Sequence, residues 1–192
     1  MTDAFVLVTG NRHKVAEAER ILGRPLEHAA LDLPEIQSLD YAEILAAKAD
    51  EAWARLGRPL IVEESGLDLV ALGGFPGPLV RWMLAAAGAE GVARTALALG
   101  DPRATARCAL LLRREASPAA DLVVAAAVPG RLVLPPRGAG GFGWDPVFVA
   151  DGEERTNAEL SGEEKDARSP RGLAWRKLAL RLATPRRRTG AC

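Results

Sequence analysis

Short apolar runs alternate along the chain with segments in which apolar residues recur every three or four positions. The runs are typical of buried strands, and the recurring pattern is typical of helices with one buried face. We expect strands at Ala4–Thr9, Leu26–Leu31, Leu60–Glu63 with the apolar run Leu67–Leu72 after it, and a hairpin of Ala104–Arg113 and Leu122–Leu134. We expect helices at Arg12–Leu22, Asp40–Leu56, Val80–Ala87, Glu90–Leu99, Ser161–Arg168 and Pro170–Leu182. Helices interleaved with strands indicate an α/β fold.

Sequence patterns also predict where two of these helices begin and end. Asp40 and Glu43 form a capping-box pattern, and Gly57 follows the last turn of the same helix, where glycine commonly ends a helix. Ser169 and Pro170 suit the N-cap and the first turn of the last helix.

Composition limits the possible functions. With 192 residues, 48% of them apolar, the chain can form a hydrophobic core in one domain or in two closely packed lobes. The formal net charge of zero gives no reason to expect binding to nucleic acid or to a membrane, so an anion would need a local site. We see no signal peptide and no membrane-spanning run. The two cysteines form no disulfide or zinc pattern, which indicates a cytoplasmic protein.

The segment Thr9-Gly10-Asn11-Arg12-His13-Lys14 joins an expected strand to an expected helix. Glycine lets the backbone approach a ligand closely, and a helix N-terminus offers free N–H groups to an anion. The segment lacks the second glycine and the Lys-Ser/Thr pair of the Walker pattern. It is therefore either a phosphate loop or an ordinary strand-to-helix turn.

Lys48 falls in the middle of an apolar helix stripe. Burial of a lysine is costly unless the chain reaches water or meets an anion, so Lys48 is either a phosphate ligand or a lysine that extends to solvent. Glu63 and Glu64 end the expected strand at 60–63 and should point to opposite faces. Either of them, together with Glu35, could hold Mg²⁺ or orient a water; the alternative is solvated surface acids.

The stretch from Gly140 to Pro146 places two aromatic residues among glycines. An accessible aromatic face suits stacking on a base, and Asp145 can accept hydrogen bonds from a base edge; an aromatic plug over the core is the alternative. Lys165 and Arg171 would add two cations nearby. They either bind the base or a phosphate of a nucleotide, or are solvated surface charges.

These motifs and their order resemble the inosine triphosphate pyrophosphatase family, the non-canonical purine NTP pyrophosphatases, from about Phe5 to Leu178. The resemblance rests on Thr9-Gly10-Asn11 with Lys14, Leu33-Pro34-Glu35, Lys48, Glu64-Ser65-Gly66, Leu72 to Pro78 with Arg81-Trp82, Phe142 to Pro146, Ala158-Glu159-Leu160, Glu164-Lys165 and Ser169-Pro170-Arg171.

The resemblance implies an elongated central mixed sheet with two α/β lobes around a cleft, and a homodimer. We expect 1–183 to form this domain and 184–192 a flexible basic tail. It also implies conversion of ITP, dITP or XTP to the monophosphate and pyrophosphate. The implied phosphate ligands are Thr9, Gly10, Asn11, Arg12, His13, Lys14, Lys48 and Lys165. The implied Mg²⁺ ligands are Glu35 and Glu64, and Glu64 is also the implied catalytic residue. The implied base contacts are Phe142, Gly143, Trp144, Asp145 and Arg171, and the resemblance also places Ser65 and Arg81 at the site.

The chain departs from the family pattern at two positions. Glu64 stands where the family usually has aspartate, which moves the carboxylate by about 1 Å, a displacement that can cost about 100-fold in rate. Pro170 stands where the family usually has histidine, so one base contact is absent and discrimination is reduced. Two alternatives follow: a nucleotide-binding protein with weak turnover, and a pyrophosphatase for a different modified nucleotide.

Overall fold

The computed structural model describes residues 5–183 and shows one open, mixed sheet with helices on both faces. The expected basic tail 184–192 lies outside the described residues. The strands are β1 (Val6–Val8), β2 (His28–Ala29), β3 (Leu60–Leu69), β4 (Pro76–Gly77), β5 (Arg103–Arg113), β6 (Leu122–Leu132) and β7 (Phe148–Ala150). The helices are α1 (Arg12–Leu22), α2 (Tyr41–Leu56), α3 (Val80–Ala98), α4 (Gly162–Arg168) and α5 (Pro170–Ala183), with short 3₁₀ turns at Val70–Leu72, Pro118–Ala120 and Asn157–Glu159.

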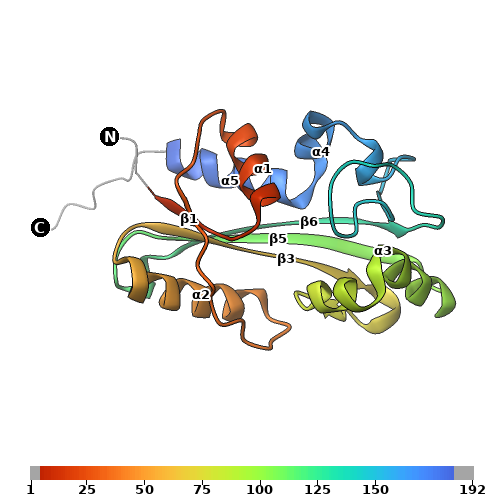
Figure 1. Ribbon diagram of the computed structural model, residues 1–192, viewed down its shortest axis with the longest axis horizontal. Helices are drawn as coiled ribbons and strands as arrows, with labels where there is room; N and C mark the ends of the chain where they lie inside the picture. Colours follow the sequence, from red (N-terminus) through yellow and green to blue (C-terminus); the bar gives the residue numbers. More distant parts are fainter. Residues whose placement is uncertain (1–4, 184–192) are drawn as a thin grey trace, which may run out of the picture.

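The strand order is β2-β1-β3-β5-β6-β7, and β4 pairs with β3 outside this sequence. Strands β2, β1 and β3 are parallel, whereas β3, β5, β6 and β7 are antiparallel. The long strands β3, β5 and β6 form the axis of the molecule, with α1, α4 and α5 on one face and α2 and α3 on the other (Figure 1). The expected mixed sheet of an α/β fold is thus confirmed.

Each group of helices closes its own apolar cluster against the sheet. On one face, Val15 of α1 and Trp175 of α5 pack with Leu110 of β5. On the other, α2 packs Leu45 against the end of β3 that contains Leu60, and α3 covers the other end of the sheet. The sheet between these clusters carries polar side chains, and the cavity described below lies there.

The expected end of a strand at Glu63 is wrong. Strand β3 continues through Glu63, Glu64, Ser65 and Gly66 to Leu69, because every residue from Leu60 to Leu69 is in register with β5. Polar residues in this stretch resemble a strand end in the sequence. They are nevertheless part of the strand, and their side chains are polar because they face a cavity and hydrogen-bonding partners rather than a packed core.

The capping box expected at α2 is also wrong. Asp40 is the N-cap and accepts a hydrogen bond from the Ala42 N–H, but the Glu43 carboxylate accepts one from the Ser38 hydroxyl. Gly57 ends α2 in the left-handed conformation, as expected. The two helices expected at 80–87 and 90–99 are confirmed as α3, which has a non-helical Gly88 between its halves. Within the described residues, no helix is long and apolar enough to cross a membrane.

Candidate active site

A cavity of about 600 Å³ lies where β3, the start of α1, the start of α3 and the loop before β7 meet. Its lining brings together most of the residues that the sequence predicted for the site: Thr9, Gly10, Asn11, Lys14, Glu35, Lys48, Glu64, Ser65, Arg81, Phe142, Gly143, Trp144, Asp145, Lys165 and Arg171. These residues come from eight separate parts of the chain. Arg12 and His13 are exposed and do not line it.

The loop before α1 is organised by its own side chains. The Asn11 carboxamide oxygen accepts hydrogen bonds from the N–H groups of His13 (2.9 Å) and Lys14 (3.4 Å), as an N-cap does. The Thr9 hydroxyl accepts a hydrogen bond from the Asn11 N–H (3.1 Å). The sequence Thr-Gly-Asn therefore turns the chain into α1 and places Lys14 on the inner side of the first turn.

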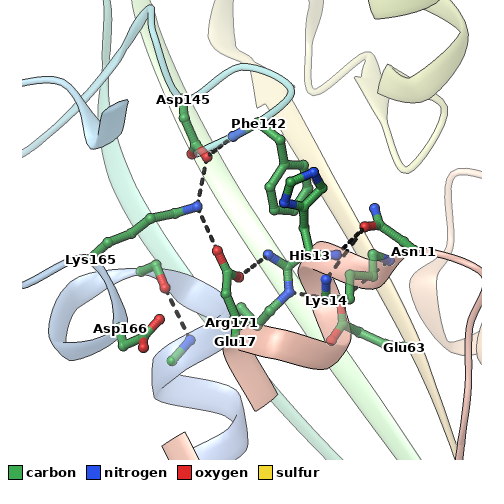
Figure 2. Close-up of polar contacts among 12 residues, drawn as sticks. Asn11, His13, Lys14, Glu17, Glu63, Phe142, Asp145, Lys165, Asp166 and Arg171 are labelled. Atoms are coloured by element: carbon green, nitrogen blue, oxygen red, sulfur yellow. Dashed lines mark hydrogen bonds and ion pairs between the residues drawn. The ribbon is translucent and has the colours of Figure 1, made fainter. Parts of the chain in front are cut away.

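Buried charges alternate in sign along one wall of the cavity (Figure 2). Lys165 donates to Asp145 (2.6 Å) and to Glu17 (2.8 Å). The other Glu17 oxygen accepts from Arg171 Nη1 (2.6 Å), and Arg171 Nε donates to Glu63 (2.9 Å). This alternation lets five charged side chains be buried together, because each charge faces an opposite one.

Glu63 is the most buried of these carboxylates, with a side chain only 1% exposed. Burial alone would raise its pKa, but the charges of Arg171 and Lys14 and hydrogen bonds from Arg171 and Trp175 lower the pKa to about 2. The Trp175 indole N–H lies 3.2 Å from Glu63, and the Lys14 ammonium 3.3 Å. Glu63 is therefore ionised at neutral pH.

Glu17 and Arg171 respond to burial in the same way. Burial would raise the pKa of Glu17, but Arg171 and Lys165 hold it below its ordinary value. Burial would lower the pKa of Arg171, but Glu63 and Glu17 raise it. Lys165 and Arg171 are 5% and 7% exposed, so the interpretation of both as solvated surface cations is wrong.

A second charged group lies on the opposite face of β3. Lys48 of α2 donates to Glu64, and its ammonium lies 3.4 Å from Glu35, which also accepts from Arg81 (3.0 Å). Lys48 therefore meets anions instead of extending to water. As predicted, Glu63 and Glu64 point to opposite faces of the strand, yet both line the cavity.

Phe142 lines the cavity, and three side chains lie against its ring. The His13 imidazole stacks on it with centroids 5.1 Å apart and an angle of 22° between the planes. The Lys165 ammonium and the Arg171 guanidinium lie 4.9 and 5.2 Å from the centroid of the same ring. Trp144, by contrast, packs against the core beneath α3, as the aromatic-plug interpretation predicted for this loop.

Asp145 holds the stretch from Gly140 to Pro146, the glycine-rich loop, against the rest of the site. Its carboxylate accepts hydrogen bonds from the Phe142 N–H (2.7 Å), the Asn157 carboxamide (3.2 Å) and Lys165. Gly141 leaves room for it, since a Cβ there would lie within 3.0 Å of the Asp145 side chain. That Asp145 reads a base edge stays a prediction.

Glu17 and Asn157 are not among the residues predicted for the site, and Glu63 is predicted there only as an alternative to Glu64. Glu17 follows Lys14 by three positions and so lies on the same side of α1, a spacing that could have indicated it. No local pattern indicates Asn157, because its partner Asp145 is brought to it only by the fold.

Comparison with known proteins agrees with this arrangement. The chain matches the sequence model of the Ham1 family over residues 5–180. It is 43% identical over 171 residues to inosine triphosphate pyrophosphatase 2 of Trypanosoma cruzi, covering 88% of this chain and 86% of the relative. It is 35% identical over 177 residues to a dITP/XTP pyrophosphatase of Hyperthermus butylicus, covering 91% and 92%.

The fold is also that of a solved relative. The HAM1 protein of Coxiella burnetii superposes with a TM-score of 0.79 at 29% identity, over 93% of this chain and 97% of that one. A sequence match over nearly the whole described chain and a shared fold agree with each other. The chain belongs to the Ham1 family.

Proposed function

We propose that this protein is a nucleoside triphosphate pyrophosphatase that hydrolyses ITP, dITP or XTP to the monophosphate and pyrophosphate. The observation that carries the proposal is that one cavity joins an Asn-capped loop with Lys14, the Glu35–Lys48–Glu64 group and the Phe142 ring. The capped loop with Lys14 suits binding of a triphosphate, the carboxylates of the Glu35–Lys48–Glu64 group suit activation of a water, and the Phe142 ring suits stacking on a base. Relatives named for ITP and for dITP and XTP hydrolysis support the same substrate class.

The donor set fits a Mg²⁺ ion that is completed by the substrate. Glu35 and Glu64 share Lys48 and so lie close together, and Mg²⁺ commonly takes one or two carboxylates together with phosphate oxygens and waters. Among the described residues there is no group of three or more potential ligands that could hold a metal alone. We therefore propose that Glu35 and Glu64 hold Mg²⁺ together with the triphosphate; a bound Mg²⁺ would supply charge neutralisation on the phosphate oxygens.

The residues of the chain have distinct parts in the proposed reaction. Lys14, Lys48 and Lys165 hold phosphate oxygens. Lys14 and Lys48 do so in exchange for carboxylates that they contact in this structure, whereas Lys165 keeps its contacts with Glu17 and Asp145. Glu64 accepts the proton of a water whose oxygen attacks the α-phosphorus in line with the leaving group. The bond from the α-phosphorus to the bridging oxygen breaks, and pyrophosphate leaves with that oxygen. Phe142 stacks on the base, and Arg171 lies beside it.

The assignment of Glu64 is tested by Glu64→Gln, which keeps the shape of the side chain and removes its basicity. Pyrophosphate release from ITP should fall by at least about 100-fold, while inosine monophosphate still binds. A Glu51→Gln variant, which changes a carboxylate of α2 that pairs with Arg55 and does not line the cavity, is the control and should keep full activity. Full activity of Glu64→Gln would refute the assignment.

Two departures from the family pattern favour a second candidate, a nucleotide-binding protein with weak turnover or with another base preference. Glu64 replaces the usual aspartate, and Pro170 lines the cavity without a side-chain donor. Pyrophosphate release measured with ITP, XTP, dITP, GTP, ATP and UTP decides between the candidates. Fast turnover of the first three alone supports the proposed function; no turnover of any substrate supports the binding protein.

We also propose a homodimer in the cytoplasm, as the resemblance implies. Sedimentation equilibrium of the full chain gives the mass directly, and a monomer at micromolar concentration would contradict the homodimer.

A further inference from the structure

We propose that the His13 imidazole occupies, in the ligand-free enzyme, the face of Phe142 on which the base stacks, so that a nucleotide must displace it. The inference rests on the proposed function, which makes Phe142 the platform for the base. His13 then has a different part from the one that the resemblance implies, which is that of a phosphate ligand.

The His13 imidazole covers one face of the Phe142 ring. His13 belongs to the first turn of α1, and Phe142 belongs to the glycine-rich loop before β7. Their centroids are 5.1 Å apart with nearly parallel planes, the arrangement of a direct aromatic stack. No third ring fits between them at this distance, so a base cannot enter as a sandwich while His13 stays in place.

The other neighbours of Phe142 cannot give way. Lys165 and Arg171 lie against the same ring, but both are buried and each has two carboxylate partners. Moving either would leave buried carboxylates without a partner, which is strongly destabilising.

His13 can move at little cost. Its side chain is exposed, and the hydrogen bond that anchors the residue comes from its backbone N–H to Asn11 (2.9 Å). The imidazole can therefore rotate away while α1 keeps its cap. His13 is thus the group that a base replaces. Because the stack between His13 and Phe142 is lost when the base binds, the free energy of that stack weakens the affinity for the base.

The histidine content of the chain allows a direct test. The full sequence has two histidines, His13 and His28, and His28 is exposed on β2. In proton NMR spectra of the whole protein, the ring current of Phe142 should shift the His13 imidazole signals upfield. Saturating inosine monophosphate, which is not hydrolysed, should move them back toward the position of a free histidine and leave those of His28 unchanged. In Phe142→Leu the His13 signals should start unshifted.

Affinity provides the second measurement. His13→Ala should bind inosine monophosphate about three- to tenfold more tightly than the unchanged protein, the factor that corresponds to one aromatic pair. His28→Ala, the matched control, should bind as the unchanged protein does. In a Phe142→Leu background, His13→Ala should have no effect, because the platform is absent.

The outcomes separate this inference from the proposed function. If inosine monophosphate binds but the His13 signals keep their upfield shift, or if His13→Ala binds it equally or more weakly, His13 does not occupy the place of the base and the inference is overturned. If inosine monophosphate does not bind at all, the proposed function fails and the inference fails with it.

Discussion

Glu63 shows how one residue can be both costly and necessary. Its carboxylate is almost completely buried in the middle of a strand, and it is stable there because Arg171, Lys14 and the Trp175 indole surround it. These contacts connect β3 to α1 and α5. The carboxylate of Glu63, which is part of the wall of the cavity, therefore also holds α1 and α5 on the sheet.

The depressed pKa of Glu63 predicts a specific sensitivity to acid. Its pKa is about 2 in the folded protein against an ordinary value of 4.5, so it contributes stability above pH 4.5 that is lost as the pH falls toward 2. The free energy of unfolding, measured with urea at several pH values, should fall over this range. In Glu63→Gln the fall should be shallower, from a starting stability lower by about 1–3 kcal/mol at pH 7.

The control is Glu27→Gln, which removes an exposed carboxylate that pairs with Arg58. It should leave the pH dependence of unfolding nearly unchanged. An identical slope between pH 4.5 and 2 in Glu63→Gln and in the unchanged protein would show that Glu63 does not set the acid limit.

At the scale of elements, sequence reasoning succeeded where the apolar pattern of a segment is unbroken. The apolar periodicity of α1 and of the hairpin β5–β6 gave bounds close to those observed. It failed at β3, where Glu63 to Gly66 serve the cavity and so break the apolar run. Local patterns conflict with the fold at functional positions because those residues are selected for chemistry.

Gly66 shows the packing constraint within β3. A Cβ there would lie within 3.0 Å of the Tyr41 hydroxyl of α2 and of the Gly77 backbone of β4. Tyr41 donates a hydrogen bond to Asp68 (3.0 Å), so its hydroxyl cannot simply move away. The absence of a side chain at position 66 therefore lets α2 and β4 approach β3.

We expect Gly66→Ala to destabilise the protein by about 1–3 kcal/mol through overpacking, seen as a lower melting temperature in calorimetry. Gly10→Ala makes the same change where nothing lies within 4 Å of the new Cβ, and its melting temperature should be close to that of the unchanged protein. Equal melting temperatures for the two variants would mean that α2 and β4 adjust freely.

At the scale of the whole molecule, the contacts of the cavity wall could not be predicted from sequence. Lys165 and Glu17 are 148 positions apart, and Arg171 and Glu63 are 108 apart. The resemblance predicted that Lys165 and Arg171 belong to the site, but which carboxylates they face depends on how α1, α4 and α5 pack. Neither spacing nor composition specifies such long-range pairs.

The charges that line the assembled cavity are almost balanced, and the formal charges of the whole chain sum to zero. Its lining has six cationic side chains, Lys14, Lys48, Arg81, Arg107, Lys165 and Arg171, and five carboxylates, Asp32, Glu35, Glu63, Glu64 and Asp145. A triphosphate would add several negative charges to this balance, and a monophosphate fewer. The cavity therefore lacks the excess of positive charge that would hold a bare triphosphate.

This balance predicts that a divalent cation contributes more to binding of a triphosphate than of a monophosphate. An ITP analogue with a methylene group between the α- and β-phosphorus is not cleaved, so calorimetry can measure its affinity with Mg²⁺ and with EDTA. We expect removal of the metal to weaken its binding by about tenfold or more, 1.4 kcal/mol or more, and to change that of inosine monophosphate much less. Equal losses for the two nucleotides would show that the metal does not balance the charge of the triphosphate, and no loss for either would show that the protein's own cations suffice.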